Sequence, residues 1–77
     1  MNRLKLRVDL KTYLQSIQVT PYQLAKWTPD VSGPTIYAIC AGTRRPSFEV
    51  LEAILNALRA QNFDAHLLDI VKEERDA

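Results

Sequence analysis

The sequence predicts one all-α or mainly α domain, a compact bundle of four to five helices that spans residues 1–77. Apolar residues recur at helical spacing in several segments, and a residue suited to cap a helix N-terminus precedes most of these segments. No linker, internal repeat or low-complexity stretch divides the chain. A chain of 77 residues buries only a modest core, so an oligomer would help to stabilise it.

The first element departs from the helical pattern. Residues 3–8 alternate strictly between charged and apolar side chains, which is the period of a half-buried strand. A short N-terminal strand is therefore slightly favoured. The apolar run 67–71 is either a strand beside it, within the chain or across a dimer, or part of a final helix that Asp64 caps.

Two further helices are predicted to build the core. The segment 9–18 is amphipathic because its apolar side chains follow the spacing i, i+3, i+4 and i+7, at Leu10, Tyr13, Leu14 and Ile17. Ser47 can cap another helix, in which Glu49 suits the first turn. The broad apolar face of that helix is expected to close the core with Val50, Leu51, Ile54, Leu55 and Leu58.

Two shorter helices are predicted between these. Thr20 can cap the first, Pro21 suits its first position, and Gln23 lies three residues after the cap, where a capping box requires it. The stretch 28–30 ends that helix, because the residue before a proline avoids the α region and aspartate favours turns. Val31 is expected to pack beneath the turn.

The second short helix is predicted to begin near Gly33, with Ser32 as its N-cap. Gly42 is suited to close this helix in a left-handed conformation. Arg44 and Arg45 follow in a short loop, where guanidinium groups can bind phosphate oxygens in a bidentate way. The inward face of the helix is expected at i, i+3 and i+4, with Ile36, Ile39 and Cys40.

Several short motifs occur in the same order between about Leu10 and Leu58. They are Tyr22-Gln23-Leu24-Ala25-Lys26, Val31-Ser32, Thr35-Ile36-Tyr37, Gly42, Arg45-Pro46-Ser47 and Leu51-Glu52-Ala53-Ile54. Together they resemble the lambda-repressor-like, Xre/Cro type of helix-turn-helix proteins. The resemblance implies a DNA-binding core over residues 20–46, whose helix 33–41 enters the major groove. It assigns the base-facing surface to Gly33, Pro34, Thr35, Tyr37 and Ala38.

Phosphate contacts are expected from hydroxyl, amide and guanidinium groups around that helix. These residues are Thr20, Tyr22, Gln23, Ser32, Thr43, Arg44 and Arg45. The two tyrosines Tyr22 and Tyr37 suit either DNA contact or cover of the core edge, and DNA contact is favoured more for Tyr37. Trp27 suits stacking on a base and packing against the turn equally well.

Two departures from the family pattern bear on recognition. The turn carries Pro29-Asp30 where the family has a single glycine, which looks like a one-residue insertion and leaves the angle between the helices open. Gly33, Pro34 and Ala38 offer none of the polar groups that usually read base edges. Readout would then depend on the hydroxyls of the base-facing set, on apolar contact with thymine methyls or on DNA shape.

Charge is divided unequally along the chain. Residues 1–46 carry seven basic and two acidic side chains, a net charge of +5, and residues 47–77 carry three basic and seven acidic side chains, a net charge of −4. The basic half coincides with the helix-turn-helix segment, so the acidic half is expected to face away from DNA. Ordinary solvated surface is the alternative interpretation.

Other function classes find little support in the sequence. One cysteine with one histidine cannot form an internal disulfide or a structural zinc site, and no enzyme activity, metal or cofactor is expected. Cys40 is expected to be a small buried hydrophobe, and His66 a surface or end-capping residue. With no membrane-length apolar run and no signal-peptide region, the chain is expected to be soluble and cytoplasmic.

The sequence therefore predicts a sequence-specific double-stranded DNA-binding regulator of transcription, a repressor in the simplest case, which acts as a homodimer on an inverted repeat. The dimer contact is expected in the C-terminal segment 62–77, at the apolar side chains Leu67, Leu68, Ile70 and Val71. Two alternatives stay open. One is an antitoxin whose toxin-binding surface lies in that segment, and the other is an interaction module that has lost specific DNA readout.

Overall fold

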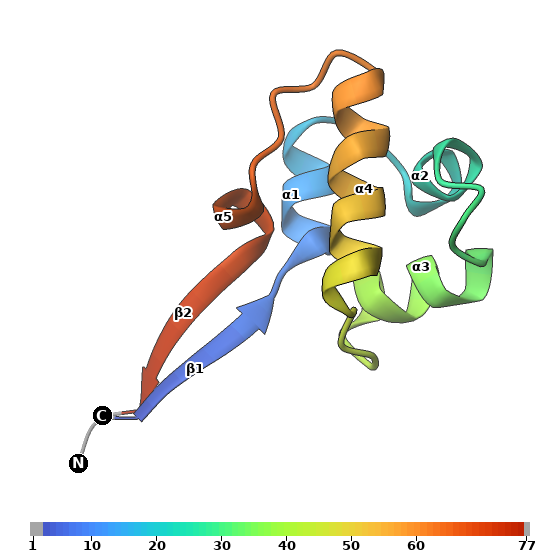
Figure 1. Ribbon diagram of the computed structural model, residues 1–77. Helices are drawn as coiled ribbons and strands as arrows, with labels where there is room; N and C mark the ends of the chain where they lie inside the picture. The colour runs from blue at the N-terminus through green and yellow to red at the C-terminus, as the bar shows by residue number, and fades with distance from the viewer. Residues whose placement is uncertain (1–2, 77) are drawn as a thin grey trace.

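The computed structural model describes residues 3–76, which form a helical body and a two-stranded arm (Figure 1). The prediction of a mainly α chain is confirmed. In chain order the elements are β1 (Arg3–Val8), α1 (Leu10–Ser16), α2 (Pro21–Trp27), α3 (Gly33–Ala41), α4 (Phe48–Ala60), α5 (Leu67–Ile70) and β2 (Val71–Asp76).

The helices of the body begin where short polar side chains satisfy the first backbone N–H groups. Asp9, Thr20, Ser32 and Ser47 each accept a hydrogen bond from the backbone N–H three residues later. α3 ends at Gly42, whose φ of 80° lies in the left-handed region that glycine adopts without strain. The predicted bounds of α2 and α3 and the predicted start of α4 are confirmed, whereas α1 ends at Ser16, two residues before the expected end of its segment.

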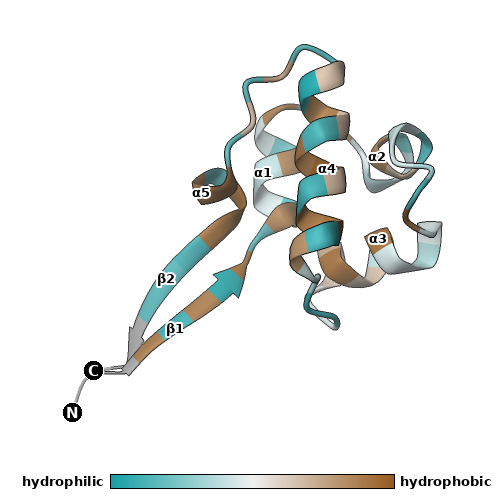
Figure 2. Cartoon of the chain, viewed as in Figure 1, coloured by the Kyte–Doolittle hydropathy of each residue, from teal (hydrophilic) through white to brown (hydrophobic). Residues whose placement is uncertain are grey.

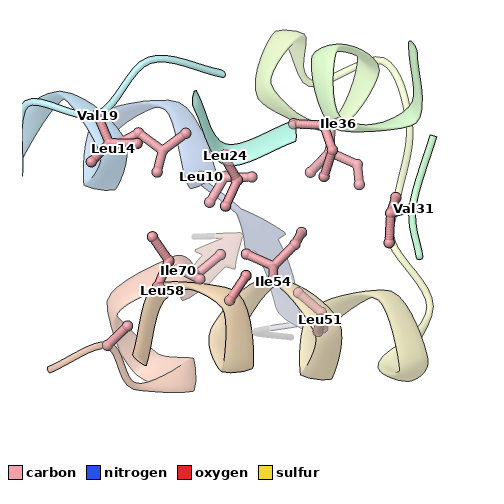
Figure 3. Close-up of a cluster of buried hydrophobic side chains, with 13 residues drawn as sticks. Leu10, Leu14, Val19, Leu24, Val31, Ile36, Leu51, Ile54, Leu58 and Ile70 are labelled. Carbon is pink, nitrogen blue, oxygen red and sulfur yellow. The ribbon is translucent and has the colours of Figure 1, made fainter. Parts of the chain in front are cut away.

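The core lies between α1, α2 and α3 on one side and α4 and α5 on the other (Figure 3). Thr28 is the buried polar residue beside this apolar cluster, and its hydroxyl donates to the Leu24 carbonyl at 2.8 Å. Its polar group is therefore satisfied within α2. The largest fully buried side chains are Leu10, Leu14, Leu24, Ile36, Ile39, Ile54, Leu58 and Ile70.

β1 and β2 pair as an antiparallel ribbon, here called the arm, that projects away from the helical body (Figure 1). The register runs from Arg3 opposite Asp76 to Val8 opposite Val71. At the base of the arm the backbone N–H of Asp9 donates to the Ile70 carbonyl at 2.7 Å. The arm gives the molecule its longest dimension of 42 Å.

The arm confirms the predicted N-terminal strand and divides the C-terminal apolar run. Leu67–Ile70 forms the single helical turn α5, and β2 begins at Val71. The helix does not start after Asp64, because the His66 backbone N–H donates to the Asp69 carboxylate at 2.9 Å and so makes His66 the N-cap residue. Among residues 3–76, no helix is long and apolar enough to cross a membrane.

Candidate nucleic-acid interface

The turn between α2 and α3 lies on the surface. Pro29 and Asp30 are exposed, and the Val31 N–H donates across the turn to the Thr28 carbonyl at 3.1 Å. Val31 itself is buried beneath the turn, as expected. Leu24 of α2 and Ile36 of α3 are both fully buried in the same core, so the two helices pack together on either side of the Pro29-Asp30 turn.

The inward face of α3 is the one its spacing predicts. Ile36 and Ile39 are buried, and Cys40 is half-buried against the core, where burial raises the pKa of its thiol. A raised pKa leaves the thiol protonated at neutral pH, which suits a small hydrophobe better than a reactive group. Tyr37 is partly exposed beside Cys40, and the two line a shallow hollow of about 290 Å³ between α1 and α3.

The five predicted base-facing residues are not equally available. Pro34 and Tyr37 are exposed, whereas Gly33, Thr35 and Ala38 are half-buried. The exposed residues of α3 are Pro34, Tyr37 and Ala41, so its outer surface offers few polar groups. Figure 2 colours the helix by residue, inward and outward alike, mostly from pale to brown.

Thr35 departs from the expectation that its hydroxyl is open to DNA. Its Oγ1 lies 2.6 Å from the Ser32 hydroxyl and accepts a hydrogen bond from Nη1 of Arg44 at 3.3 Å. The N-cap residue of α3 and the loop after α3 therefore meet at one side chain. If this hydroxyl is to contact a base, it must first give up one of its hydrogen bonds within the protein.

Some of the predicted phosphate-binding residues are hydrogen-bonded within the protein, and others are exposed to solvent. Thr20 and Gln23 form the capping box of α2, with the Thr20 N–H donating to Gln23 Oε1 at 3.0 Å and the Gln23 N–H donating to Thr20 Oγ1 at 3.1 Å. Thr43 donates through its hydroxyl to the Ala38 carbonyl at 3.2 Å, which closes α3. These side chains have local partners before any ligand arrives.

The four remaining residues of the phosphate set are all exposed, and of these Ser32 caps α3 through the Thr35 N–H. Arg44 and Arg45 lie on the surface directly after α3, where the loop presents two permanent positive charges. Tyr22 is exposed on α2, and the Lys26 ammonium lies 4.9 Å from its ring centroid. The arrangement places exposed cations at both α2 and the end of α3.

The expectation that the acidic half faces away from DNA stays a prediction, but the basic and acidic halves of the chain are not fully separated in space. β1 carries three of the basic residues of the N-terminal half, and it pairs residue by residue with the acidic strand β2. Nε of Arg7 lies 2.9 Å from the Glu74 carboxylate. The basic side chains of β1 and the acidic side chains of β2 meet because the two strands pair in one ribbon. A charge count along the sequence does not show this pairing. Exposed basic side chains around α3 include Arg44 and Arg45 after the helix, Lys11, which lines a pocket with them, and Lys26 on α2.

The predicted dimer contact requires a correction. Ile70 is 1% exposed and belongs to the core of its own chain, and Val71 is half-buried opposite Val8 at the base of the arm. Only Leu67 and Leu68 of the four predicted residues are exposed. This division follows because α5 docks onto the body by one side only.

Two other residues are placed in structural roles. Trp27 packs against the core, and its ring centroid lies 6.2 Å from that of Phe63 in a tilted arrangement, so packing accounts for this side chain. His66 is exposed, with Nε2 2.9 Å from the Asp64 carboxylate. This agrees with the expected surface, end-capping histidine.

Phe48 is a surface feature that the sequence analysis did not identify. It is the first residue of α4 and is 82% exposed. Phe48 lies three residues before Leu51 and ten before Leu58, a spacing that puts it on the same face of the helix as these buried residues. Periodicity alone would therefore place Phe48 in the core. Phe48 lies outside the core although Leu51 of the same turn lies inside it, and the sequence pattern does not show this boundary.

Comparison of the chain with family models, with curated proteins and with solved structures produced no match in any of the three searches. The lambda-repressor-like resemblance therefore rests on the motifs of this chain and on the helix pair described above.

Proposed function

We propose that this protein is a double-stranded DNA-binding regulator of transcription, a repressor, that inserts α3 into the major groove. The observation that carries the proposal is the combination of a capped α2–turn–α3 pair with two exposed arginines at the end of the second helix. An exposed helix flanked by guanidinium groups fits a groove that phosphates border on both sides.

Positioning and readout are assigned to different groups. Arg45 is exposed and binds phosphate, a contact that fixes orientation without sequence information. Arg44 donates a hydrogen bond to the Thr35 hydroxyl. A phosphate that binds Arg44 therefore also changes whether the Thr35 hydroxyl is free to contact a base edge. Tyr37 supplies an exposed hydroxyl, and Pro34 supplies apolar contact with a thymine methyl.

A protein-interaction module is the second candidate function. The observation in its favour is that Thr35, one of the two hydroxyls in the base-facing set, is already bonded to Ser32 and Arg44. The remaining surface of α3 is largely apolar, which a protein partner would cover as readily as a groove.

Selection of bound sequences from a random duplex pool separates these functions. An enriched motif supports a specific reader, and no recovery of DNA supports the interaction module. Recovery of unselected DNA with a steep salt dependence would instead show binding to the backbone alone.

The arginine assignment is tested by titrating Arg45→Ala and Arg44→Ala at several salt concentrations. Loss of one phosphate contact should lower the slope of log affinity against log salt by about 1 in each variant. Arg44→Ala should in addition alter base preference, because it releases Thr35, whereas Arg45→Ala should weaken all sequences alike. Lys72→Ala, which removes a cation from the arm, is the matched control, and an equal fall in its slope would contradict the assignment.

A further inference from the structure

The outer edge of β1 carries backbone groups that β2 does not pair. The sheet described for residues 3–76 has two strands, so each strand is hydrogen-bonded on one side only. The Asp9 N–H donates to the Ile70 carbonyl, at the position that continues the register of β1 with β2. Residues of an antiparallel strand direct their N–H and C=O groups alternately toward the partner strand and away from it. Counted back from Asp9, the backbone groups of Leu6 and Val8 therefore point to the outer edge.

A groove of about 760 Å³ follows this edge. Four consecutive residues of β1, 5–8, line it, and consecutive residues of a strand project to opposite faces. A groove lined from both faces of a strand runs along the edge of that strand. The opposite wall is formed by the end of α3, the loop after it and the start of α4, with Gly42, Arg45 and Phe48. In Figure 1, β1 is the strand of the arm nearer to the start of α4, and β2 lies on the far side of β1.

The groove carries an excess of positive charge. Among the described residues that line it, five are basic and two are acidic, a net charge of +3. Both acidic side chains pair with Arg7, whose Nη2 lies 3.7 Å from the Asp9 carboxylate and whose Nε lies 2.9 Å from that of Glu74. Four exposed cations remain to attract an acidic partner, namely Lys5, Lys11, Arg44 and Arg45.

Apolar side chains lie among these cations. Leu6 is 59% exposed and Phe48 is 82% exposed, and both line the groove together with Val8. A phosphate backbone would pair with the cations but would bring little apolar surface to cover Leu6 and Phe48. The groove therefore suits a partner that supplies apolar and acidic side chains together.

The sequence of β1 disfavours a second copy of this chain at the same edge. If two β1 edges meet with their apolar faces aligned, basic residues oppose one another, because Lys5 and Arg7 alternate with the leucines. The outer edge of β2 against that of β1 is a head-to-tail contact, which does not close at a dimer. A strand from a different protein is subject to neither constraint.

We propose that the groove binds an extended segment of another protein, in which acidic and apolar residues alternate, as a third strand of the arm. The segment hydrogen-bonds to the outward N–H and C=O groups of Leu6 and Val8. Cross-strand neighbours share a face, so its apolar side chains lie beside those of Leu6 and Val8 and its carboxylates beside Lys5 and Arg7. The third strand also supplies support, since a two-stranded ribbon is only marginally stable in water.

The groove would link this partner to DNA binding. Arg44 and Arg45 line it and are also the residues assigned above to phosphate. A bound acidic segment would compete with DNA for both guanidinium groups. This consequence rests on the proposed function, whereas binding of the segment does not, and the experiment below contains no DNA.

The probe is a fluorescent synthetic peptide of alternating valine and glutamate, slightly longer than β1, titrated with the full chain. Fluorescence anisotropy should show saturable binding. Lysine in place of every glutamate, or serine in place of every valine, should weaken binding about tenfold or more. The serine peptide keeps the negative charge, so equal binding of this peptide would show a surface for any polyanion, a phosphate backbone included, and would overturn the proposal.

Leu6→Pro tests the pairing along the edge. Proline removes the outward N–H of residue 6 and leaves the bonds between β1 and β2 in place, because an edge strand tolerates proline where the N–H faces outward. Leu6→Ala, which shortens the side chain and keeps the N–H, is the matched control. Leu6→Pro should weaken peptide binding several-fold more than Leu6→Ala, and equal losses would contradict an added strand.

Phe48→Gln tests the opposite wall without touching the arm. Phe48 is exposed at the start of α4, so its variant should unfold at the same temperature as the native chain. Peptide binding should weaken about tenfold, because an apolar contact is lost. Leu68→Gln is the control, since Leu68 is 76% exposed but lies outside the groove lining, and it should bind the peptide as the native chain does. Equal effects of the two substitutions would count against the groove.

Amide hydrogen exchange locates the added strand in the native chain. The free protein should protect the amides of Lys5 and Arg7, which face β2, more than those of Leu6 and Val8. Saturation with the valine–glutamate peptide should slow exchange most at Leu6 and Val8. The proposal is overturned if these two amides gain no protection, or if they are already protected in the free chain to a degree that rises with its concentration, which would mean that a second copy occupies the edge.

Discussion

The helical body buries its central apolar side chains, whereas the arm leaves its leucines exposed. In the body, helices from both ends of the chain cover one another, and the leucines and isoleucines at the centre are fully buried. In the arm, a strict alternation of apolar and charged residues produces a regular ribbon, yet Leu4 and Leu6 remain more than half exposed. Regular local structure therefore does not guarantee burial, because burial requires a second layer.

The comparison also separates two kinds of stabilisation. The body relies on apolar burial and on helix caps with partners three residues apart. The arm relies on its backbone ladder and on exposed ion pairs such as Arg7 with Glu74. Exposed ion pairs contribute little individually, so the arm is expected to be the weaker part of an isolated chain.

The largest expected effect is a loss of unfolding free energy in α5, and it tests which residues of this helix belong to the helical body. Ile70→Ala should lower the free energy of unfolding by about 2–5 kcal/mol, since it opens a cavity in the core. Leu68→Ala, two residues earlier and exposed, should change it by about 0.5 kcal/mol or less. Urea denaturation of both variants checks the difference, and similar losses in the two would show that α5 does not dock as described.

An intermediate effect is expected at the end of α3. Alanine at Gly42 meets no heavy atom within 4 Å, so the cost of Gly42→Ala comes from its φ of 80° alone and should be about 1 kcal/mol. Gly33→Ala is the matched control, because its added Cβ also meets open space and Gly33 lies at the helical start of α3. Thermal unfolding should show a loss for Gly42→Ala only, and equal shifts in both variants would contradict a left-handed cap.

The smallest effect is expected in the arm. Arg7→Ala removes an ion pair whose side chains are 57% and 49% exposed, so the loss in unfolding free energy should be at most about 0.5 kcal/mol and should vanish at high salt. Lys72 lies directly opposite Arg7, and Lys72→Ala relieves a like-charge pair. Hydrogen exchange of the β1 amides should therefore quicken in the first variant but not in the second, and a salt-independent change would indicate a packing role for Arg7.

Much of the candidate interface could be predicted from neighbouring residues. The capping box of Thr20 and Gln23, the caps at Ser32 and Ser47 and the left-handed Gly42 all involve groups a few residues apart, so the sequence alone indicates them. The Thr35 hydroxyl has a local partner in Ser32, but its contact with Arg44 could not be assigned in this way, because Arg44 lies nine residues away in a loop after the helix. Whether that hydroxyl is open to DNA depends on how the loop folds back.

The sequence by itself determined the bounds of α2 and α3, the start of α4, the inward face of α3 and the strand period of residues 3–8, because each follows from backbone geometry and contacts within one or two turns. Only the tertiary structure decided that the acidic C-terminal strand pairs with the basic N-terminal one, that Ile70 is buried while Leu68 is not, and that Phe48 lies beyond the edge of the core. The physical reason is that coverage of a side chain depends on elements distant in the sequence, and periodicity records which face is apolar but not what packs against it.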